Sequence, residues 1–374
     1  MTVVFDTGPL DRGTRFSKPR RIIRADGPEE VEDALRQIAE AQARKSWLAG
    51  YFSYELGYCL LDRLKPLLPE PRHDPLILLG EFDDCEIAVP EPADRNPPRD
   101  LRMTPLWSET DYAAAFSKTQ DYIAAGDCYQ INLTFPIDVQ CAATPAEFYR
   151  ALRTSQPVGH GAFVDLGGPV LLSRSPELFF QVDPTGRITT RPMKGTIARG
   201  PTDEEDDEAR DWLERSEKNR AENLMIVDLL RNDISRIAEV GSVKVPRLFT
   251  VEAYATVHQM TSTVTARLLP GTTLPDILQA LYPSGSIIGA PKVRAMEIIR
   301  SLEPFPRGPY CGAIGWVAPD GAMSFNVAIR TLVDRGGGCY ALNVGGGVVH
   351  DSDAAAEYEE ALWKSRFARL PGTT

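Results

Sequence analysis

The feature that most constrains the fold is a series of short alternating runs in the last hundred residues of the sequence. Two runs of alternating apolar residues, 311–318 and 322–333, flank the turn-forming triplet Pro319-Asp320-Gly321. A short glycine-containing connection between two alternating runs is typical of a β-hairpin. A third run, 339–344, follows three consecutive glycines. The pattern therefore predicts sequential strands in an antiparallel sheet.

The expected helices are grouped in blocks and do not alternate with the strands. Residues 28–45 begin with acidic and end with basic side chains, which favours a helix because of its dipole. Thr202 with Glu205 three residues later forms a capping box and predicts one long helix over 202–230. Further helices are expected at 111–125, 144–155, 274–281, 291–301 and 354–370, and further strands at 46–58, 76–89, 127–139, 161–164, 170–172, 178–182, 242–246 and 261–268. Hairpin-linked strands with helices in separate blocks predict an antiparallel α+β fold.

The composition argues against several classes of function. The net charge is −11 over 374 residues, whereas nucleic-acid-binding proteins usually carry a basic face. No apolar run approaches the ~20 residues that a membrane-spanning helix needs, and the N-terminus does not resemble a signal peptide. The six cysteines are scattered without Cys-x-x-Cys spacing, which argues against a zinc site or a redox dithiol. We therefore expect a cytoplasmic protein that binds neither nucleic acid nor membrane.

One lysine is held on a restricted stretch of backbone. Lys194 lies between Pro192 and Gly195, directly after a β-prone run over 187–190. A lysine becomes a nucleophile when it is desolvated or set beside another cation. The alternative is a solvated lysine in a surface loop, and the residues alone leave both interpretations open.

Two helices place carboxylates on one face. Glu222 shares a helical face with Asn219, and Glu360 shares one with Glu357 and Lys364. Two carboxylates on two helices could hold Mg²⁺, which prefers oxygen ligands. Surface ion pairing, for instance of Glu360 with Lys364, is the alternative.

Several other residues are candidates for binding anions or moving protons. The triplet Gly345-Gly346-Gly347 and the glycine loop over 284–292 could bring bare amides to a carboxylate, although each also fits a tight turn. Arg330 could clamp a carboxylate with two hydrogen bonds, or lie on the surface. Glu177 precedes three apolar residues, where a raised pKa would suit a proton donor. Of the four histidines, His258 lies just before a strand, and a lone histidine is most often structural.

Eight blocks in order resemble the chorismate-utilising enzymes, a family that includes anthranilate synthase component I, aminodeoxychorismate synthase component I, and the isochorismate and salicylate synthases. The blocks are GDCYQINL, SRSPELFF, RPMKGT, AENLMIVDLLRND, GSIIGAPKVRAMEII, FNVAIRTL, NVGGGVV and AEYEEALWK. They cover residues 110–369, with a weaker match before them. The resemblance implies large antiparallel sheets that form a β-sandwich core with helices packed outside. It also implies a chorismate-binding catalytic region over 101–374 and an N-terminal α+β subregion over 1–100 that packs on the same core. Independently of the resemblance, the density of proline and polar residues makes 90–98 the best candidate for a linker.

The resemblance also implies roles for individual residues. Glu222 and Glu360 match the Mg²⁺ ligands, with Glu357 and Asn219 nearby, and the metal is expected to hold the ring carboxylate of chorismate. Arg330 matches the arginine that holds the enolpyruvyl carboxylate. The remaining expected substrate contacts are Gly195, Thr196, Ser286, Gly346, Gly347 and Lys364.

Lys194 distinguishes two branches of that family. The resemblance places alanine here in anthranilate synthases and lysine in aminodeoxychorismate synthases, where the lysine attacks the ring and ammonia then displaces it. Glu177 matches the acid that assists departure of the hydroxyl. This implies amination of chorismate in 4-aminobenzoate and folate biosynthesis. Ammonia is expected from a separate glutamine amidotransferase subunit, because the sequence has no Gly-x-Cys-x-Gly with a matching His-x-Glu. Anthranilate synthase component I and a non-catalytic chorismate-binding subunit remain the alternatives.

Two positions depart from the family pattern. A Val-x-His-Leu-x-Ser histidine is expected near the active site, but that position is Gln259 here, and His258 stands one residue earlier. A tyrosine that helps to hold the enolpyruvyl carboxylate is expected at Trp316, whose indole N–H could also donate. The sequence leaves open which of His258 and Gln259 takes the histidine's role, and whether the N-terminal region binds tryptophan.

Overall fold

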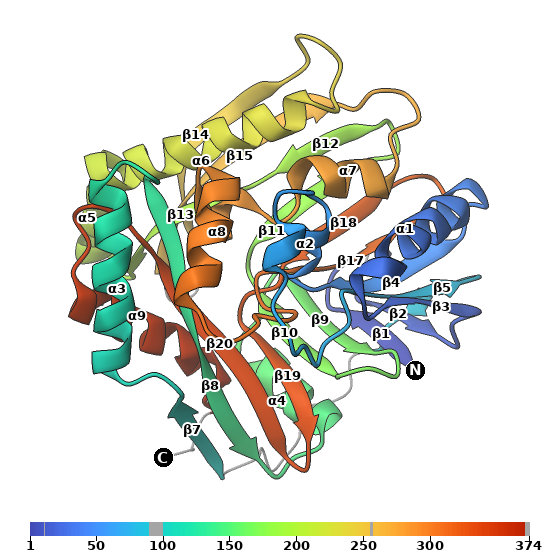
Figure 1. Cartoon of the computed structure of the whole chain (residues 1–374), viewed down its shortest axis with the longest axis horizontal. Coiled ribbons are helices and arrows are strands. Elements are labelled where there is room, and N and C mark those ends of the chain that lie inside the picture. The colour runs from blue at the N-terminus through green and yellow to red at the C-terminus, as the bar shows by residue number, and fades with distance from the viewer. Residues whose placement is uncertain (11, 90–99, 255–256, 371–374) are drawn as a thin grey trace.

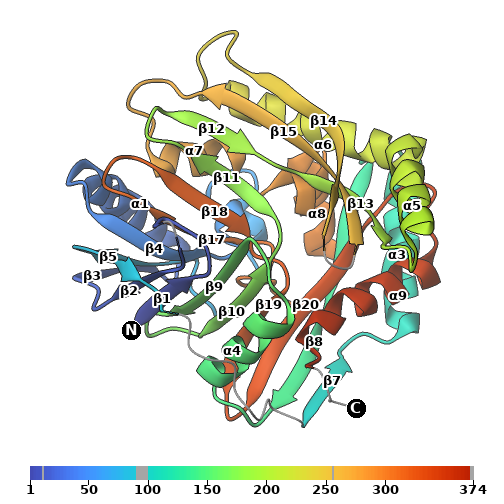
Figure 2. The same ribbon diagram turned by 180° about the vertical axis from the view of Figure 1, so that it is seen from behind.

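The computed structural model describes residues 1–10, 12–89, 100–254 and 257–370 (Figure 1). Two large sheets dominate the fold, and every strand pairing in them is antiparallel. Helices cover the outer faces of both sheets (Figures 1 and 2). The predicted α+β architecture, a β-sandwich with helices packed outside, is therefore confirmed.

The first sheet is built around two long central strands, β8 and β20. Its strands in spatial order are β16 (Gly289–Ala290), β8 (Gln130–Cys141), β20 (Cys339–Val348), β19 (Thr331–Gly336), β10 (Leu171–Ser175), β9 (His160–Asp165), β1 (Thr2–Phe5), β2 (Thr14–Ser17) and β6 (Glu86–Ile87). A further strand, β7 (Leu101–Pro105), also pairs with β8.

The second sheet runs alongside the first. Its strands in spatial order are β13 (Met193–Ala198), β15 (Val257–Arg267), β12 (Arg187–Thr190), β11 (Leu178–Val182), β18 (Met323–Val327), β17 (Ala313–Val317), β4 (Trp47–Phe52), β5 (Ile77–Phe82) and β3 (Arg21–Ala25). Strand β14 (Lys244–Ala253) also pairs with β15. Strands from before residue 90 contribute to both sheets, while the expected linker 90–98 lies outside the described residues.

Three apolar clusters hold the layers together. Between the sheets, side chains such as Phe16 and Val164 of the first sheet meet Leu78 and Ile314 of the second. The outer face of the second sheet packs against α1 (Pro28–Ala43), α2 (Leu56–Cys59), α6 (Glu217–Ser235), α7 (Leu274–Leu281) and α8 (Lys292–Leu302). The outer face of the first packs against α3 (Glu109–Ala124), α4 (Pro145–Ser155) and α9 (Ala354–Ser365). Burial of these apolar faces supplies the main driving force for folding.

Local capping chemistry sets several helix starts. The Thr144 hydroxyl accepts a hydrogen bond from the Glu147 amide, and Glu147 reaches back to the Thr144 amide at 2.9 Å. The Thr202 hydroxyl caps α5 (Asp203–Arg215): it accepts a hydrogen bond from the Glu205 amide at 3.3 Å and donates one to the Glu205 carboxylate at 2.8 Å. Such caps satisfy amides that have no partner within the helix. The prediction of Thr202 as the N-cap is therefore confirmed, although Glu205 bonds the Thr202 hydroxyl and not its amide.

The prediction of one long helix over 202–230 is wrong. Ser216 adopts an extended backbone conformation and separates α5 from α6. Its hydroxyl accepts a hydrogen bond from Nδ2 of Asn219 at 2.9 Å and from the Asn219 amide, so it caps a new helix. A serine inside a helical pattern can serve as an N-cap because its hydroxyl replaces a backbone partner.

The hairpin around Pro319-Asp320-Gly321 is confirmed, but the single strand predicted over 322–333 is wrong. Strand β18 belongs to the second sheet and β19 to the first, so the chain crosses between the layers after Val327. Arg330 takes a φ of 50° at this crossing, and its carbonyl accepts a hydrogen bond from the Arg174 amide at 2.9 Å. The crossing brings both layers to one place in the molecule.

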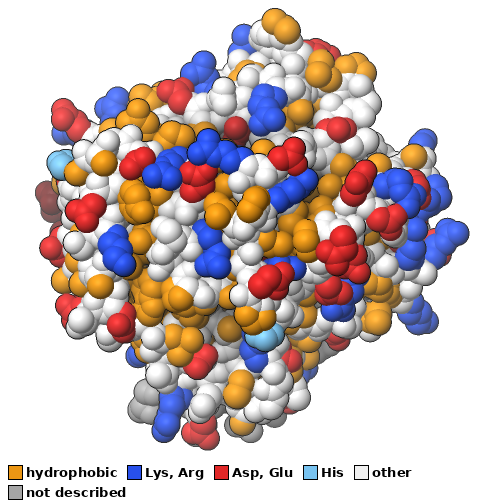
Figure 3. All heavy atoms as spheres, in the orientation of Figure 1, with side chains coloured by type: hydrophobic (Ala, Val, Ile, Leu, Met, Phe, Trp, Pro, Cys, Tyr) orange, Lys and Arg blue, Asp and Glu red, His pale blue; other side chains and the backbone are white. Residues whose placement is uncertain are grey.

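The surface carries charges of both signs. On the face seen in Figure 3, acidic and basic side chains are interspersed with apolar ones. Among the described residues, no helix is both long and apolar enough to cross a lipid bilayer.

Candidate active site

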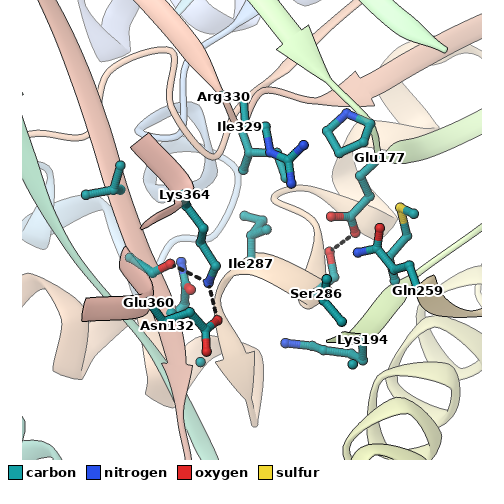
Figure 4. A pocket seen from close by; sticks show the side chains of 18 of the residues that line it. Asn132, Glu177, Lys194, Gln259, Ser286, Ile287, Ile329, Arg330, Glu360 and Lys364 are labelled. Atoms are coloured by element: carbon teal, nitrogen blue, oxygen red, sulfur yellow. Dashed lines mark hydrogen bonds and ion pairs between the residues drawn. The ribbon is translucent and has the colours of Figure 1, made fainter. Parts of the chain in front are cut away.

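A cavity of about 550 Å³ lies between strands of both sheets and helices α6 and α9. Figure 4 shows side chains from segments far apart in the sequence, among them Lys194, Glu177, Arg330 and Lys364, around one space. The charged side chains that line it are Glu177, Lys194, Lys218, Glu222, Arg330, Glu357, Glu360 and Lys364. Four cationic and four acidic side chains thus share one hollow, which is the electrostatic setting expected for a small anionic ligand that also needs acid–base chemistry.

Lys194 reaches the cavity from β13, where the pairing with β15 is irregular between Met193 and Thr196. Gly195 has a φ of +76°, and a Cβ there would lie 2.9 Å from Oδ1 of Asn219, so glycine is required. The half-buried Lys194 side chain forms no ion pair or hydrogen bond with another described residue. Burial lowers its pKa, although Glu222 and Glu177 oppose that shift. A lowered pKa raises the fraction of neutral, nucleophilic amine.

Glu177 lies in the short connection between β10 and β11 and is 6% exposed. The Ser286 hydroxyl donates a hydrogen bond to its Oε1 at 2.7 Å (Figure 4). Burial raises the pKa of Glu177 to about 7, although Ser286, Lys194 and Arg330 favour the charged form. A carboxylic acid with this pKa can hold and release a proton near neutral pH.

Arg330 enters from the crossing between the sheets. Its guanidinium lines the cavity and makes no hydrogen bond to another described residue. Burial lowers its pKa, against the attraction of Glu177. Its donors are therefore free to bind a carboxylate bidentately.

Three carboxylates line the opposite end of the cavity. Burial raises the pKa of Glu222, against Lys194 and Lys218, and raises that of Glu357, against a 2.8 Å hydrogen bond from Ser352. Burial acts the same way on Glu360, but Lys364, whose Nζ lies 2.8 Å from Oε1, outweighs it and lowers the pKa. Glu222 and Glu357 are partly buried and Glu360 is exposed, and carboxylates grouped in this way favour a cation among them.

The donor type at this end fits Mg²⁺, which binds one or two carboxylates and keeps several waters. Lys364 already provides a cation at Glu360, and its ammonium also donates to the Gly345 carbonyl at 2.9 Å. Within the described part of the chain, no three His, Cys, Asp or Glu side chains stand close enough together to hold a metal ion. The residues present therefore suit a metal bound through one or two carboxylates and not a closed protein cage.

Two glycines in β20 form the floor of the cavity. A Cβ at Gly346 would lie 2.7 Å from Oε2 of Glu357, and one at Gly347 would lie 3.4 Å from Nζ of Lys194. Side chains at these positions would fill the space between the catalytic candidates. The glycine triplet thus leaves room for a ligand against bare backbone.

A family model described as chorismate binding enzyme matches residues 5–369. The chain belongs to the chorismate binding enzyme family. The resemblance seen in the sequence is thereby confirmed, and the match extends through the N-terminal hundred residues as well.

Individual relatives of this family come from two branches. Aminodeoxychorismate synthase component 1 of Klebsiella aerogenes is 46% identical over 266 residues, which are 70% of this chain and 58% of that protein. The Escherichia coli K12 protein of the same name is 40% identical over 80% of this chain and 66% of its own length. Anthranilate synthase component 1 of Streptomyces coelicolor is 40% identical over 76% of this chain and 55% of that protein. The chain spans between about half and two thirds of these relatives.

The fold of the family is also found in a solved structure. Anthranilate synthase component I from Streptococcus pneumoniae TIGR4 superposes with a TM-score of 0.82 at 26% identity, covering 94% of this chain and 91% of that one. The two-sheet architecture described above is thus the fold of anthranilate synthase component I.

Most residues singled out in the sequence meet in this cavity, but two do not. The cavity contains Lys194, Glu177, Gly195, Thr196, Asn219, Glu222, Gln259, Ser286, Arg330, Gly346, Gly347, Glu357, Glu360 and Lys364. His258 faces away from it, because its neighbours Val257 and Gln259 take the cavity side of β15. Nε2 of His258 instead lies 2.9 Å from Oδ1 of Asp206 on α5.

Trp316 also lies away from the cavity. It pairs with Ala49 and Ser324 within the second sheet, and its ring lies beside Gly8. The tyrosine that lines the cavity is Tyr310, six residues earlier. Tyr310 lies in the turn that precedes β17, so no alternating pattern predicted which way its side chain faces. The sequence feature that could have identified Tyr310 as a cavity residue is its position close to the start of β17.

Sequence reasoning also missed a polar row on β8. Gln130, Asn132 and Thr134 are all buried and alternate along one face of this strand. Asn132 lines the cavity. Alternating polar residues inside an otherwise apolar strand were the signal that could have revealed them.

Proposed function

We propose that this chain aminates chorismate with ammonia to give 4-amino-4-deoxychorismate, a step toward 4-aminobenzoate and folate. The observation that carries the proposal is the pairing of Lys194 with Glu177 in one cavity. The lysine has a lowered pKa, and the acid has a pKa of about 7. An amine poised to attack beside an acid poised to protonate suits the loss of a hydroxyl group. The relatives in Klebsiella aerogenes and Escherichia coli carry names for this activity.

The reaction proceeds through a bond to Lys194. The neutral Nζ bonds to a carbon of the ring diene, the double bonds shift, and the C4–O bond breaks. Glu177 supplies the proton with which the hydroxyl leaves as water. Ammonia then bonds to C4, the double bonds shift back, and the electron pair of the C–Nζ bond returns to the lysine. The new ammonium group gives a proton to Glu177, so the sum is chorismate and ammonia to 4-amino-4-deoxychorismate and water.

The other side chains hold the substrate for this chemistry. Arg330 binds the enolpyruvyl carboxylate with its free donors, in the cavity that Tyr310 also lines. Glu222 and Glu360, with Glu357 nearby, would hold Mg²⁺, which when bound would supply positive charge for the ring carboxylate. Gly346, Gly347 and Ser286 let the ring lie against the backbone, and Lys364 balances the charge at Glu360 when no metal is bound. Ammonia reaches the cavity from solution or from a separate glutamine amidotransferase subunit.

The test is the product of the ammonia reaction. The chain is incubated with chorismate, MgCl₂ and ammonium chloride, with and without a lyase that cleaves 4-amino-4-deoxychorismate. We expect 4-aminobenzoate only when the lyase is added. We also expect a Lys194→Ala variant to form no product while a Lys244→Ala variant, changed at an exposed lysine of β14, stays active. Anthranilate fluorescence without the lyase would refute the proposal, and turnover with glutamine alone would refute the separate glutaminase.

A second function is favoured by one observation. The Streptomyces coelicolor relative, at 40% identity over 76% of this chain, is named anthranilate synthase component 1. The same incubation separates the two activities, because anthranilate synthesis also releases pyruvate. Pyruvate released without the lyase therefore identifies the second function.

A further inference from the structure

The wall of the cavity that carries Lys194 has a helix on its back. Strands β13 and β15 form this wall, and α5 packs against both of them (Figure 2). Thr196 and Gln259 are paired across the two strands and line the cavity. The next pair, Ile197 and His258, therefore faces α5, because successive residues of a strand alternate between its two faces. The position of α5 thus affects the wall from which Lys194 projects.

The backbone at Lys194 has little support from its own sheet. Lys194 and Gly195 lie in the irregular part of the pairing between β13 and β15, where neither has a partner residue. Gly195 lies instead against α5 and α6. A Cβ at Gly195 would be 3.0 Å from Cδ1 of Leu213 and 2.9 Å from Oδ1 of Asn219. Packing against these two helices therefore holds the backbone beside the lysine.

Helix α5 has a single apolar anchor and one polar anchor. Of its 13 residues, all within the described part of the chain, only Leu213 is fully buried. Burial of one leucine contributes ~1.5–3 kcal/mol, which is little for fixing a whole helix. Asp206 lies seven residues earlier, two turns or about 10 Å along the axis and on the same face. Its side chain is 15% exposed, against 77% for Asp207, so Asp206 points inward from an otherwise solvated acidic run.

Asp206 joins α5 to both strands of the cavity wall. Its Oδ1 accepts hydrogen bonds from Nε of Arg199 at 2.6 Å, from the Gly200 amide at 2.9 Å and from Nε2 of His258 at 2.9 Å. Its Oδ2 accepts a fourth from Nη2 of Arg199 at 2.6 Å. Glycine is needed at residue 200, because a Cβ there would collide with the backbone of Glu205 and Asp206. The start of α5 is therefore tied to the residues that follow β13 and to the start of β15.

His258 acts as a donor in this cluster. The hydrogen bonds from Arg199, Gly200 and His258 hold the pKa of Asp206 well below its usual range, against the effect of desolvation. Asp206 is therefore a carboxylate that can only accept, so Nε2 of His258 carries the shared proton. Nδ1 of His258 is buried and has no hydrogen-bond partner among the described residues. The polar contact of the ring is thus directed at α5 and not at the cavity.

We propose that Asp206, with Arg199 and His258 as its donors, is a positioning residue for Lys194. This inference rests on the proposed function, in which Lys194 is the nucleophile, and it gives His258 a role other than acid–base chemistry. The cluster fixes the start of α5, and two turns later Leu213 holds the backbone beside the lysine. A reacting group that is misplaced by about 1 Å can lose about 10²-fold in rate.

The cluster lies outside the cavity, which makes its effect separable from substrate binding. Arg199, Asp206 and His258 are absent from the side chains that line the cavity, all of which belong to the described residues. Loss of the cluster should therefore slow the attack of Lys194 and leave the binding of chorismate unchanged. This split between the chemical step and the KM distinguishes a positioning residue from a general support of the fold.

The experiment compares Asp206→Asn, His258→Leu and His258→Gln with the unchanged chain and with Asp207→Asn. Asparagine keeps the shape of Asp206 but loses its charge, leucine removes the Nε2 donor of His258, and glutamine keeps an N–H near that position. Asp207 is an exposed carboxylate of the same helix and serves as the matched control. The measured quantities are kcat, the KM for chorismate at saturating ammonium, Tm, and the rate at which the Lys194 adduct forms without ammonia, followed by intact-protein mass spectrometry.

We expect Asp206→Asn and His258→Leu to slow adduct formation and lower kcat at least tenfold, with the KM for chorismate unchanged within twofold. His258→Gln should lower both rates less than threefold, because its amide can still donate to Asp206. The pH dependence of kcat/KM in His258→Gln should match that of the unchanged chain, since His258 exchanges no proton with the substrate. Asp207→Asn should alter none of these quantities.

Three outcomes would overturn the inference. An unchanged rate of adduct formation in both Asp206→Asn and His258→Leu would show that the cluster does not position the lysine. A rise in the KM for chorismate equal to the loss of rate would indicate a general disturbance of the cavity. Loss of activity in His258→Gln at an unchanged Tm would make His258 an acid or base of the reaction.

The design remains decisive if one variant does not fold. Should Asp206→Asn lose its unfolding transition, the comparison of His258→Leu with His258→Gln decides alone, because the two differ in the donor to Asp206. A wild-type chain that forms no amino product would instead refute the proposed function, so the two failures are distinguishable.

Discussion

Replacement of Glu177 by glutamine tests two claims: that this side chain acts as an acid in the reaction, and that its burial makes the stability of the fold depend on pH. The change keeps the shape of the side chain, and its carbonyl oxygen can still accept the hydrogen bond from Ser286. It removes the charge that the buried site disfavours. Because the pKa of Glu177 is raised in the folded chain, the folded state binds more protons than the unfolded state between the two pKa values. Glu177 therefore stabilises the fold at low pH, and this contribution is lost as the pH rises through about 7.

The size of this effect follows from the pKa. A rise from 4.5 to about 7 corresponds to about 3 kcal/mol between the two extremes of pH. Between about pH 5.5 and pH 8.5 roughly 2 kcal/mol of it remains to be lost. The Glu177→Gln variant has no such titration. We therefore expect its free energy of unfolding, relative to the unchanged chain, to increase by about 2 kcal/mol over this interval, measured by urea denaturation at both pH values.

The activity of the Glu177→Gln variant should fall, although its stability relative to the unchanged chain rises with pH. Loss of the acid should lower kcat by about 10²–10⁴-fold. In the unchanged chain kcat/KM for chorismate should decline above about pH 7, as Glu177 loses its proton. The control is Glu359→Gln, a change at an exposed carboxylate of α9. A stability difference that does not vary with pH would refute the argument from burial, and a fully active Glu177→Gln variant would refute the acid role.

The remaining predictions concern the cavity floor, the metal end and the helix break. The methyl group of Gly347→Ala would lie 3.0 Å from the Gln130 amide and should lower kcat/KM for chorismate at least tenfold without lowering Tm. Unchanged kinetics would contradict the proposal that the substrate lies against Gly347. Glu360→Gln should abolish Mg²⁺-dependent turnover, and normal turnover at the same MgCl₂ concentration would remove this residue from the metal site. Ser216→Ala should lower the free energy of unfolding by about 1 kcal/mol, and a change below about 0.3 kcal/mol would show that the cap of α6 is dispensable.

Local sequence signals correctly predicted those features of the structure that depend only on residues close together along the chain. The caps at Thr144 and Thr202 and the hairpin before β18 all arise within a few residues. The break at Ser216 shows the limit of such signals. A serine is compatible with both a helix interior and an N-cap, and packing elsewhere decides between them.

Candidate site residues could be recognised individually, but their orientation could not always be derived. His258 and Gln259 are adjacent on β15, so they face opposite sides, and a pattern shifted by one residue exchanges their environments. Only the position of α5 beside β15 shows that His258 meets Asp206 and leaves Gln259 in the cavity. The expectation that Trp316 contacts the substrate does not match its position for a similar reason. The layer against which β17 packs determines which side of the strand Trp316 faces.

The place of β20 in the first sheet has a consequence for how the protein forms during synthesis. Among the described strands β20 is the last in the chain, yet it lies in the interior of its sheet, between β8 and β19. Until it emerges from the ribosome, both neighbours present unpaired edges, and such edges favour association with other chains. The cavity floor that β20 carries is also missing until then. A nascent chain therefore completes its sheet and its binding site in one late step, and slow translation over residues 339–348 should increase aggregation.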